Sequence, residues 1–361
     1  MFRLLLVGVL AAALNFAPVA QACTGIRLIA ADGGVVAART LEFGFDLHSE
    51  VLIVPAGTAL TGTLPNGAKG ISYKTRYGFV GANAEGLDAI VDGINDHGLY
   101  VGLFYFPGYA SYAESTAQNS ARAMAPHEYA NWLLGNFATV EEVKANFDKV
   151  VLVPVVIEAI EQAAPVHFVV HDRSGKSAVI EPLNGSLKIY DDPLGVVTNS
   201  PTFDWHMTNL RNYVNLTATN VPPIGVGGIK LAQLGQGSGL RGLPGDFTPP
   251  SRFVRAVAFS QSALPSATAA EAVLQAFHIL NNFDIPFGSV REVNNGQTHA
   301  EATVWTSAAD LKNLRWYFKT YDNQSIRAVD VVKALAAAQG RIRHISMESR
   351  QPIIDVSADF R

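Results

Sequence analysis

The sequence predicts an α+β fold in which β-sheets are covered by helices. Apolar residues make up 48% of the 361 residues and charged residues 16%, as is typical of a globular protein. Segments with the alternating pattern of strands occur in runs, and segments with helical signals occur in separate runs. Strands and helices do not alternate as in βαβ units, and no Pro/Ser-rich linker or internal repeat divides the chain. We therefore expect a single domain over residues 23–361.

The first 22 residues differ in composition from the rest of the chain. Arg3 precedes the apolar run 4–14, and the segment ends on the small residues of Ala20-Gln21-Ala22. This is the pattern of a secretory signal peptide. The apolar run is shorter than the ~20 residues that a helix needs to cross a bilayer, and no other run is long enough. We therefore expect residues 1–22 to be removed and the mature protein to be secreted or periplasmic, without stable membrane insertion.

The first half of the mature chain is expected to hold most of the strands. The alternating segment from Thr24 to Phe43 surrounds the turn Ala31-Asp32-Gly33-Gly34 and predicts a hairpin. Pro126 suits the first turn of a helix, and the capping box Thr139-Val140-Glu141-Glu142 predicts another helix that ends before Val150. The other strands that we expect lie at 51–54, 71–80, 88–94, 99–106, 166–170, 178–180 and 187–190.

The second half is expected to be more helical. A helix at 201–212 is followed by a Gly-rich loop at 225–245 and by a helix at 251–262. The capping box Thr268-Ala269-Ala270-Glu271 opens a further helix. A pair of strands at 303–307 and 316–321 completes the prediction.

Charge and motifs give no support to nucleic-acid, metal or cofactor binding. The net charge of −4 supplies no basic field for a phosphate backbone. His127-Glu128 begins like a zinc-binding helix motif, but Asn131 stands where the second histidine ligand must fall. Gly175-Lys176-Ser177 lacks the upstream glycine of a phosphate-binding loop. We expect no metal, no cofactor and no nucleic-acid partner.

Cys23 is the only cysteine, and it directly follows the expected cleavage point. No internal disulfide can form. A lone cysteine in an exported protein can pair with another chain, carry a lipid or serve as a free reactive thiol, and a small residue at this place can also have no role beyond cleavage. A lipoprotein signal would require a branched apolar residue at the position of Ala20, so the sequence fits ordinary cleavage after Ala22 better.

Cleavage after Ala22 would give one residue both a thiol and a free α-amine. The unperturbed pKa of an α-amine lies near ~8, so this amine can act as a general base at neutral pH. Nucleophile and base would then both belong to Cys23, and no separate histidine would be required. This is the arrangement of an N-terminal-nucleophile hydrolase, which is inactive until the preceding segment is removed.

Several blocks in order along the mature chain carry a family resemblance. They are Cys23-Thr24-Gly25-Ile26-Arg27, Arg39-Thr40-Leu41-Glu42-Phe43, Asn95-Asp96-His97-Gly98-Leu99, Tyr105-Phe106-Pro107-Gly108-Tyr109-Ala110, 197–206, Leu243-Pro244-Gly245-Asp246 and Ser251-Arg252-Phe253-Val254-Arg255. Together they resemble the choloylglycine hydrolase family, which includes bile salt hydrolases and penicillin V acylases. The resemblance implies an αββα four-layer sandwich, with two stacked antiparallel sheets between helical layers, and a homotetramer.

The resemblance also implies roles for single residues. Cys23 matches the nucleophile, which would attack the carbonyl of a linear, non-peptide amide to form an acyl-enzyme. Arg39 matches an arginine beside the thiol, where its charge would favour the thiolate. Arg252 matches a second arginine of the site, and Asn199 matches an asparagine whose amide would donate to the oxyanion.

Two positions differ from patterns that are common in the family. Glu42 stands where many members have an aspartate that holds the α-amine, and it is one methylene longer. At the position where bile salt hydrolases commonly have asparagine, this chain has Tyr105, and in this it resembles penicillin V acylases. An aromatic residue in the pocket wall favours an aromatic or fatty acyl group over a conjugated steroid.

The sequence thus predicts an exported amidase without a cofactor that acts on a small-molecule amide. We expect penicillin V, N-acyl homoserine lactones and conjugated bile salts as candidate substrates, in that order. A conjugated bile salt hydrolase is the alternative enzyme, and a lipid-anchored binding protein that uses Cys23 only for attachment is the alternative from another class.

Overall fold

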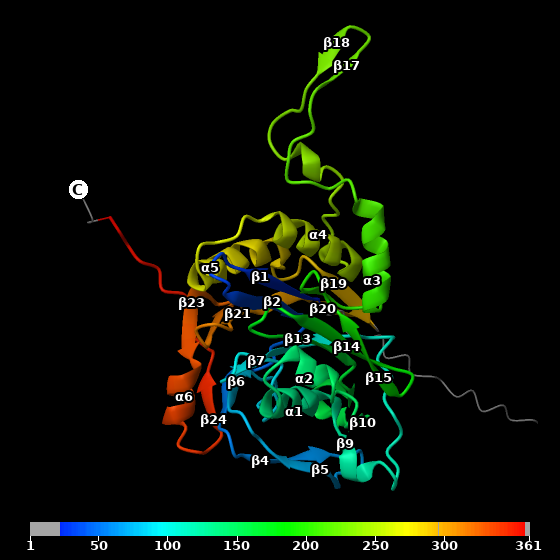
Figure 1. Cartoon of the computed structure of the whole chain (residues 1–361), viewed down its shortest axis with the longest axis vertical. Helices are drawn as coiled ribbons and strands as arrows, with labels where there is room; N and C mark the ends of the chain where they lie inside the picture. The colour runs from blue at the N-terminus through cyan, green and yellow to red at the C-terminus, as the bar shows by residue number, and fades with distance from the viewer. Residues whose placement is uncertain (1–21, 295, 358–361) are drawn as a thin grey trace, which may run out of the picture.

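Two stacked antiparallel β-sheets form the centre of the molecule, and helices cover their outer faces (Figure 1). The computed structural model describes residues 22–294 and 296–357, so the expected signal peptide lies outside the described residues except for Ala22. The order of layers is helix, sheet, sheet, helix. This is the αββα sandwich that the family resemblance implied.

The first sheet has six strands and contains the N-terminal hairpin in its centre. Their order across the sheet is β16-β1-β2-β21-β22-β23, and each pairs with its neighbour antiparallel. The strands are β1 (Cys23–Ile29), β2 (Val35–Phe43), β16 (Val196–Val197), β21 (Ala302–Asp310), β22 (Arg315–Thr320) and β23 (Asn323–Asp330).

The second sheet has eight strands, in the order β15-β14-β13-β8-β7-β6-β3-β24, and it is antiparallel throughout. Its strands are β3 (Glu50–Val54), β6 (Phe79–Ala82), β7 (Asp92–Asn95), β8 (Tyr100–Tyr105), β13 (Val166–His171), β14 (Ser177–Leu183), β15 (Ser186–Asp191) and β24 (Arg343–Ser346). Buried apolar side chains of both sheets fill the space between them.

Helices α4 (Pro249–Ser262) and α5 (Ala269–Leu280) cover the outer face of the first sheet, where α4 contacts β1 and α5 contacts β2 and β21. Helices α1 (Tyr129–Asn136) and α2 (Val140–Lys144) lie on the far side of the second sheet (Figure 1), and α1 contacts β7 and β8. Both expected capping boxes begin a helix. The hydroxyl of Thr139 accepts from the Glu142 N–H at 3.1 Å, and that of Thr268 from the Glu271 N–H at 3.3 Å.

The N-terminal hairpin and most of the other expected strands are present, but three expectations need correction. The segment 71–80 is not one strand, because β5 (Lys69–Lys74) ends at Lys74 and β6 begins only at Phe79. Between them, the N–H groups of Arg76 and Tyr77 donate to the Gly135 carbonyl. The helix at 201–212 consists of α3 (Phe203–Asn209) and a 3-10 turn, Leu210–Tyr213. Three further elements, β23, β24 and α6 (Val331–Ala337), were not predicted from the sequence.

The third correction concerns the Gly-rich loop at 225–245, which contains a hairpin. Strands β17 (Ile224–Val226) and β18 (Ile229–Leu231) pair around Gly227 and Gly228, whose φ angles are +58° and +82°. Positive φ at both positions is what a two-residue hairpin turn requires. The hairpin stands at the tip of an arm, residues 214–247, that projects from the body of the molecule (Figure 1).

Four smaller ribbons complete the fold. They are β4 (Ala59–Thr63) with β5, β9 (Ala123–Met124) with β10 (Val151–Leu152), β11 (Val156–Ile157) with β12 (Gln162–Ala163), and β19 (Arg291–Asn294) with β20 (Gln297–Ala300). None of the helices within the described part of the chain has the length and apolar character needed to span a bilayer.

Candidate active site

The N-terminal hairpin places the thiol at a cavity between the two sheets. Cys23 is the first residue of β1 and lies opposite Leu41 of β2. Alternate residues of a strand share a face. Arg39, Leu41 and Phe43 therefore project from β2 toward the same cavity as Cys23. The Cys23 side chain is buried, with 4% of the residue exposed.

This thiol cavity is small and mostly apolar. Its volume is about 110 Å³. The two sheets, the segments 43–47 and 84–89, the turn at His127 and the segment 157–164 supply its wall. The lining residues are Cys23, Arg39, Leu41, Phe43, Leu47, Ala84, Glu85, Leu87, Ala89, Val91, Leu103, Tyr105, His127, Ile157, Ile160, Ala164 and Val166. Such a surface suits the apolar acyl part of a substrate.

Arg39 is fully buried at this cavity. Its guanidinium lies over the Phe104 ring at 4.2 Å from the centroid, and it donates to the backbone carbonyls of Leu103 and Val91, the latter at 3.4 Å. Its Nη2 atom has no hydrogen-bond partner within the described residues. A fixed positive charge that lines the same cavity as a thiol favours ionisation of that thiol.

Asn199 and Arg252 meet at the backbone of Cys23. The Cys23 N–H donates to Asn199 Oδ1 at 2.8 Å, and Arg252 Nη2 donates to the same oxygen at 2.6 Å. Arg252 Nη1 donates to the Cys23 carbonyl and, at 3.0 Å, to the hydroxyl of Thr24. Because two donors meet at Oδ1, the amide orientation is fixed. Asn199 Nδ2 donates one hydrogen to the Tyr105 carbonyl at 2.7 Å, which leaves its second N–H available.

Glu42 is buried on the helix-facing side of β2. Its Oε1 atom accepts from the Thr303 hydroxyl at 3.1 Å, and its Oε2 atom has no partner among the described residues. Burial raises the pKa of Glu42 to about 8, and the charge of Arg252 opposes this rise. No hydrogen bond joins Glu42 to Cys23 in the described part of the chain, where Ala22 still precedes Cys23 and its carbonyl accepts from the Glu42 N–H at 2.9 Å.

Tyr105 ends β8 and forms part of the cavity wall. Its hydroxyl accepts from Gln162 Nε2 at 2.9 Å, and 7% of the residue is exposed. Burial raises the pKa of Tyr105 to about 12, so the phenol is neutral at physiological pH. The hydrogen bond to Gln162 holds the ring against the ribbon β11–β12.

The structure thus brings all six predicted site residues into one region, with Glu42 behind the sheet. Sequence reasoning missed Thr303, which orients Glu42, and Glu301, a buried residue whose charge interacts with Arg252. The strand expected at 303–307 was the only sequence signal for Thr303, and no signal pointed to Glu301. No group of three or more His, Cys, Asp or Glu side chains within 22–294 and 296–357 is arranged to hold a metal ion.

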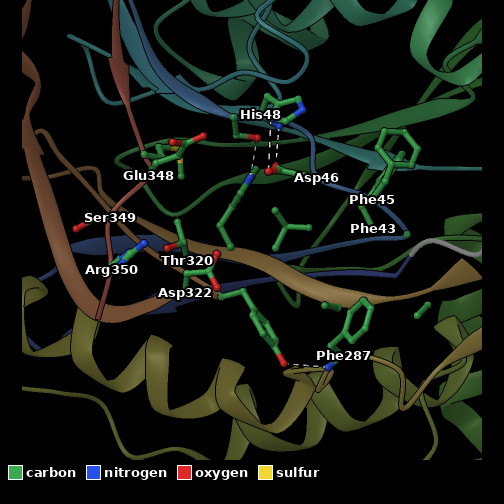
Figure 2. Close-up of a pocket in the computed structure, with 18 residues that line it drawn as sticks. Phe43, Phe45, Asp46, His48, Phe287, Thr320, Asp322, Glu348, Ser349 and Arg350 are labelled. Atoms are coloured by element: carbon green, nitrogen blue, oxygen red, sulfur yellow. Dashed lines mark hydrogen bonds and ion pairs between the residues drawn. The ribbon is translucent and has the colours of Figure 1, made fainter. Parts of the chain in front are cut away.

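A larger hollow of about 740 Å³ lies beyond Phe43, which lines both spaces. Figure 2 shows Phe43 and Phe45 on one side of it and Glu348, Ser349 and Arg350 of the C-terminal segment on the other. It does not contain the thiol, so its size does not make it the candidate active site.

Comparisons with known proteins show the family. The family model of linear amide C–N hydrolases, choloylglycine hydrolase family, matches residues 23–340. A bile salt hydrolase/transferase of Clostridium perfringens is 33% identical over 86% of this chain and 93% of its own length. A penicillin V acylase of Pectobacterium atrosepticum is 26% identical over 84% of this chain and 79% of its own length.

Solved structures show the same fold. A mutant of the conjugated bile acid hydrolase from Clostridium perfringens superposes with a TM-score of 0.81 at 31% identity, over 93% of this chain and all of that one. Penicillin V acylase from Agrobacterium tumefaciens gives a TM-score of 0.72 at 24% identity, over 91% and 92% of the two chains, which supports the fold alone. The chain is therefore a linear amide C–N hydrolase and belongs to the choloylglycine hydrolase family.

Proposed function

We propose that the mature protein is an N-terminal-cysteine amidase for amides with a slim apolar or aromatic acyl group, such as penicillin V or N-acyl homoserine lactones. The observation that carries this proposal is the thiol of Cys23 at a small apolar cavity that also holds Arg39 and Tyr105. The match of the family model from Cys23 onward supports the same start of the mature chain.

The proposed reaction begins at the thiol of Cys23. The thiol gives its proton to the α-amine, and the sulfur attacks the substrate carbonyl carbon. The tetrahedral intermediate collapses as the C–N bond breaks, and the α-ammonium returns the proton to the leaving amine. Water, activated by the same α-amine, then cleaves the thioester and releases the carboxylic acid and the free thiol.

We assign the oxyanion to the free N–H of Asn199. Arg252 fixes the amide by donating to Oδ1, and the Tyr105 carbonyl takes the other N–H. A donor that is held in place before the reaction stabilises the developing charge without having to reorganise.

Glu42 is assigned to the α-ammonium of mature Cys23. Its Oε2 atom is buried without a partner while Ala22 is present, and a buried carboxylate oxygen without a donor is costly. Removal of residues 1–22 creates an ammonium group at Cys23, next to the strand that carries Glu42.

The size of the cavity favours a slim acyl group. A cavity of roughly 150 Å³ is enough to bind benzene, and the thiol cavity has about 110 Å³. The thiol cavity is smaller than that, so every candidate acyl group requires some widening, and a phenoxyacetyl group or an alkyl chain requires less of it than a steroid nucleus does. Conjugated bile salt hydrolysis is the second candidate, because relatives that are 30–36% identical carry that name.

A hydrolysis panel tests the substrate assignment. We expect the wild type to have a larger kcat/KM for penicillin V or a long-chain N-acyl homoserine lactone than for glycocholate. Tyr105→Asn should move the ratio toward glycocholate by about 10-fold or more, the usual scale of one pocket change. Tyr105→Phe removes only the bond to Gln162 and serves as the control. A wild type that prefers glycocholate, or a ratio unchanged by Tyr105→Asn with a lowered Tm, would reject the assignment.

We further propose that the protein is exported and forms a homotetramer. Export rests on the signal-like segment before Cys23. Assembly is supported by the arm at 214–247, which exposes Ile224, Val226, Ile229 and Leu231 to solvent.

A further inference from the structure

A buried carboxylate joins the two sheets behind the thiol cavity. Asp92 belongs to β7 of the second sheet and is fully buried. Its Oδ2 atom accepts from Trp316 Nε1 of the first sheet at 2.8 Å, and its Oδ1 atom accepts from the hydroxyl of Tyr100. Both donors are neutral. An ionised carboxylate in such an interior needs a nearby positive charge to offset its desolvation.

Arg39 supplies that charge. It makes no ion pair among the described residues, and it donates to the carbonyl of Val91, the residue directly before Asp92. Its guanidinium is held between the rings of Phe104 and Trp305, at 4.2 and 5.4 Å from their centroids. Burial raises the pKa of Asp92, and the charge of Arg39 opposes that rise. The two buried charges therefore compensate each other across the space between the sheets.

We propose that Asp92 is a positioning residue that acts through Arg39: as its buried counter-charge, it limits how strongly Arg39 favours the thiolate of Cys23. Asp92 does not line the thiol cavity, so it touches neither the substrate nor the reacting atoms. The inference rests on the proposed function of Cys23 as the nucleophile. A thiol whose pKa is too low is a weaker nucleophile, so a partly offset Arg39 keeps the thiol both ionisable and reactive.

Among the titratable groups near Arg39 and the thiol, Asp92 is the one whose negative charge can offset the charge of Arg39. Arg39 on β2 lines the cavity together with the thiol, and Arg252 on α4 and Tyr100 on β8 are close enough for their charges to interact with Cys23. Burial raises the pKa of Tyr100 well above its ordinary value, so it is neutral. His171 on β13 stacks on Tyr100, and burial lowers its pKa well below its ordinary value, so it is neutral as well. The charge of Arg252 is opposed by Glu42, on the other side of the first sheet.

The experiment measures the rate of iodoacetamide labelling against pH on the protein that begins at Cys23. Cys23 is the only cysteine, so the labelling midpoint reports this thiol alone. Asp92→Asn keeps the shape and one acceptor oxygen but removes the negative charge. We expect the midpoint to fall by about half a pH unit or more, because Arg39 is then uncompensated. Arg39→Ala should move it in the opposite direction.

Asp310→Asn is the matched control. Asp310 is an equally buried carboxylate on β21. It accepts from the backbone N–H groups of Lys312 and Asn313 and from the Asn313 side-chain amide, away from the cavity. This variant should lose stability and keep the wild-type midpoint. Tyr100→Phe is the second test, because it keeps the ring and removes one donor to Asp92, which makes the carboxylate less ionised. Its midpoint should also fall.

An unchanged or raised midpoint in a folded Asp92→Asn protein overturns the proposal, as does an equal shift in Asp310→Asn. If Asp92→Asn does not fold, an unchanged midpoint in Tyr100→Phe has the same meaning. Labelling requires no substrate. A shifted midpoint in a protein that hydrolyses no amide would therefore refute the proposed function and leave the role of Asp92 intact.

Discussion

At the scale of single residues, Asn199 links the nucleophile, Arg252 and the end of β8. We expect Asn199→Ala to lower kcat by ~10²–10³, since it removes the assigned oxyanion donor. Asn95→Ala is the control: Asn95 is also buried, but its amide donates to the backbone carbonyls of Leu134 and Phe137, away from the thiol cavity. Steady-state kinetics and the Tm of both variants separate a loss of catalysis from a loss of stability. Equal losses of kcat in the two variants would assign Asn199 a purely structural role.

Glu42 makes stability depend on pH while Ala22 is retained. Its folded pKa of about 8 lies above the ordinary 4.5, so the folded state binds the proton more tightly than the unfolded state. The stabilisation is complete below pH 4.5 and is lost as pH rises toward 8, with a slope of at most roughly 1.4 kcal/mol per pH unit. Denaturant unfolding across this range should show the decline.

Two comparison proteins isolate the contribution of Glu42. Glu42→Gln should remove its part of the slope, because the amide does not titrate. The chain that begins at Cys23 should also have a flatter profile, because the α-ammonium partners the carboxylate. If Glu42→Gln declines as steeply as the parent protein, the titrating group is another residue.

The sequence indicated which residues belong to the site, but their bonds could not be read from it. Cys23, Arg39 and Glu42 share one hairpin, so their proximity follows from strand pairing. Asn199 and Arg252 come from distant segments, and the orientation of the Asn199 amide depends on donors that are 176 and 53 residues away. The family roles of these residues remain predictions that kinetics must test.

At the scale of elements, β1 must approach β8 closely, and Gly25 permits it. A Cβ atom at Gly25 would lie 2.7 Å from Phe104 Cζ and 2.9 Å from Val197 Cγ1. The guanidinium of Arg39 lies over the ring of Phe104 in a cation–π contact. We expect Gly25→Ala to cost about 1–3 kcal/mol of stability and to raise the thiol labelling midpoint, because Phe104 and Arg39 must move.

Gly225→Ala on the arm is the control for this prediction, since a Cβ there meets nothing within 4 Å. The double variant Gly25→Ala with Phe104→Leu should recover part of the stability by making room. A Gly25→Ala protein with wild-type Tm and labelling profile would mean that the two strands do not depend on this close approach.

Local patterns predicted the elements that have strong local signals. Alternation predicted the N-terminal hairpin, and capping boxes predicted the starts of α2 and α5. The break of 71–80 depends on the Gly135 carbonyl at the end of α1, a contact that no local pattern contains. Strand β24 pairs with β3 across almost 300 residues of sequence and is exposed, so it carries little apolar alternation.

At the scale of the whole molecule, the arm is the feature without a partner. If it joins copies of the chain, charged residues on its apolar face should break the assembly. We expect Ile224→Asp with Ile229→Asp to convert the proposed homotetramer to smaller species in sedimentation velocity. Leu274→Asp, an exposed apolar site on α5, is the control. A double variant that sediments as the wild type does would exclude the arm from the contacts that hold the assembly together.

The free α-amine of Cys23 is the feature on which the proposed chemistry depends most. Two proteins that differ by one residue test it: one begins at Cys23 and the other retains Ala22. Both should fold, because the pairing of β1 with β2 begins at Cys23 in either protein. We predict that amide hydrolysis is seen only in the protein that begins at Cys23, since a peptide nitrogen cannot act as the base. Equal kcat/KM for the two proteins would contradict the N-terminal-nucleophile mechanism.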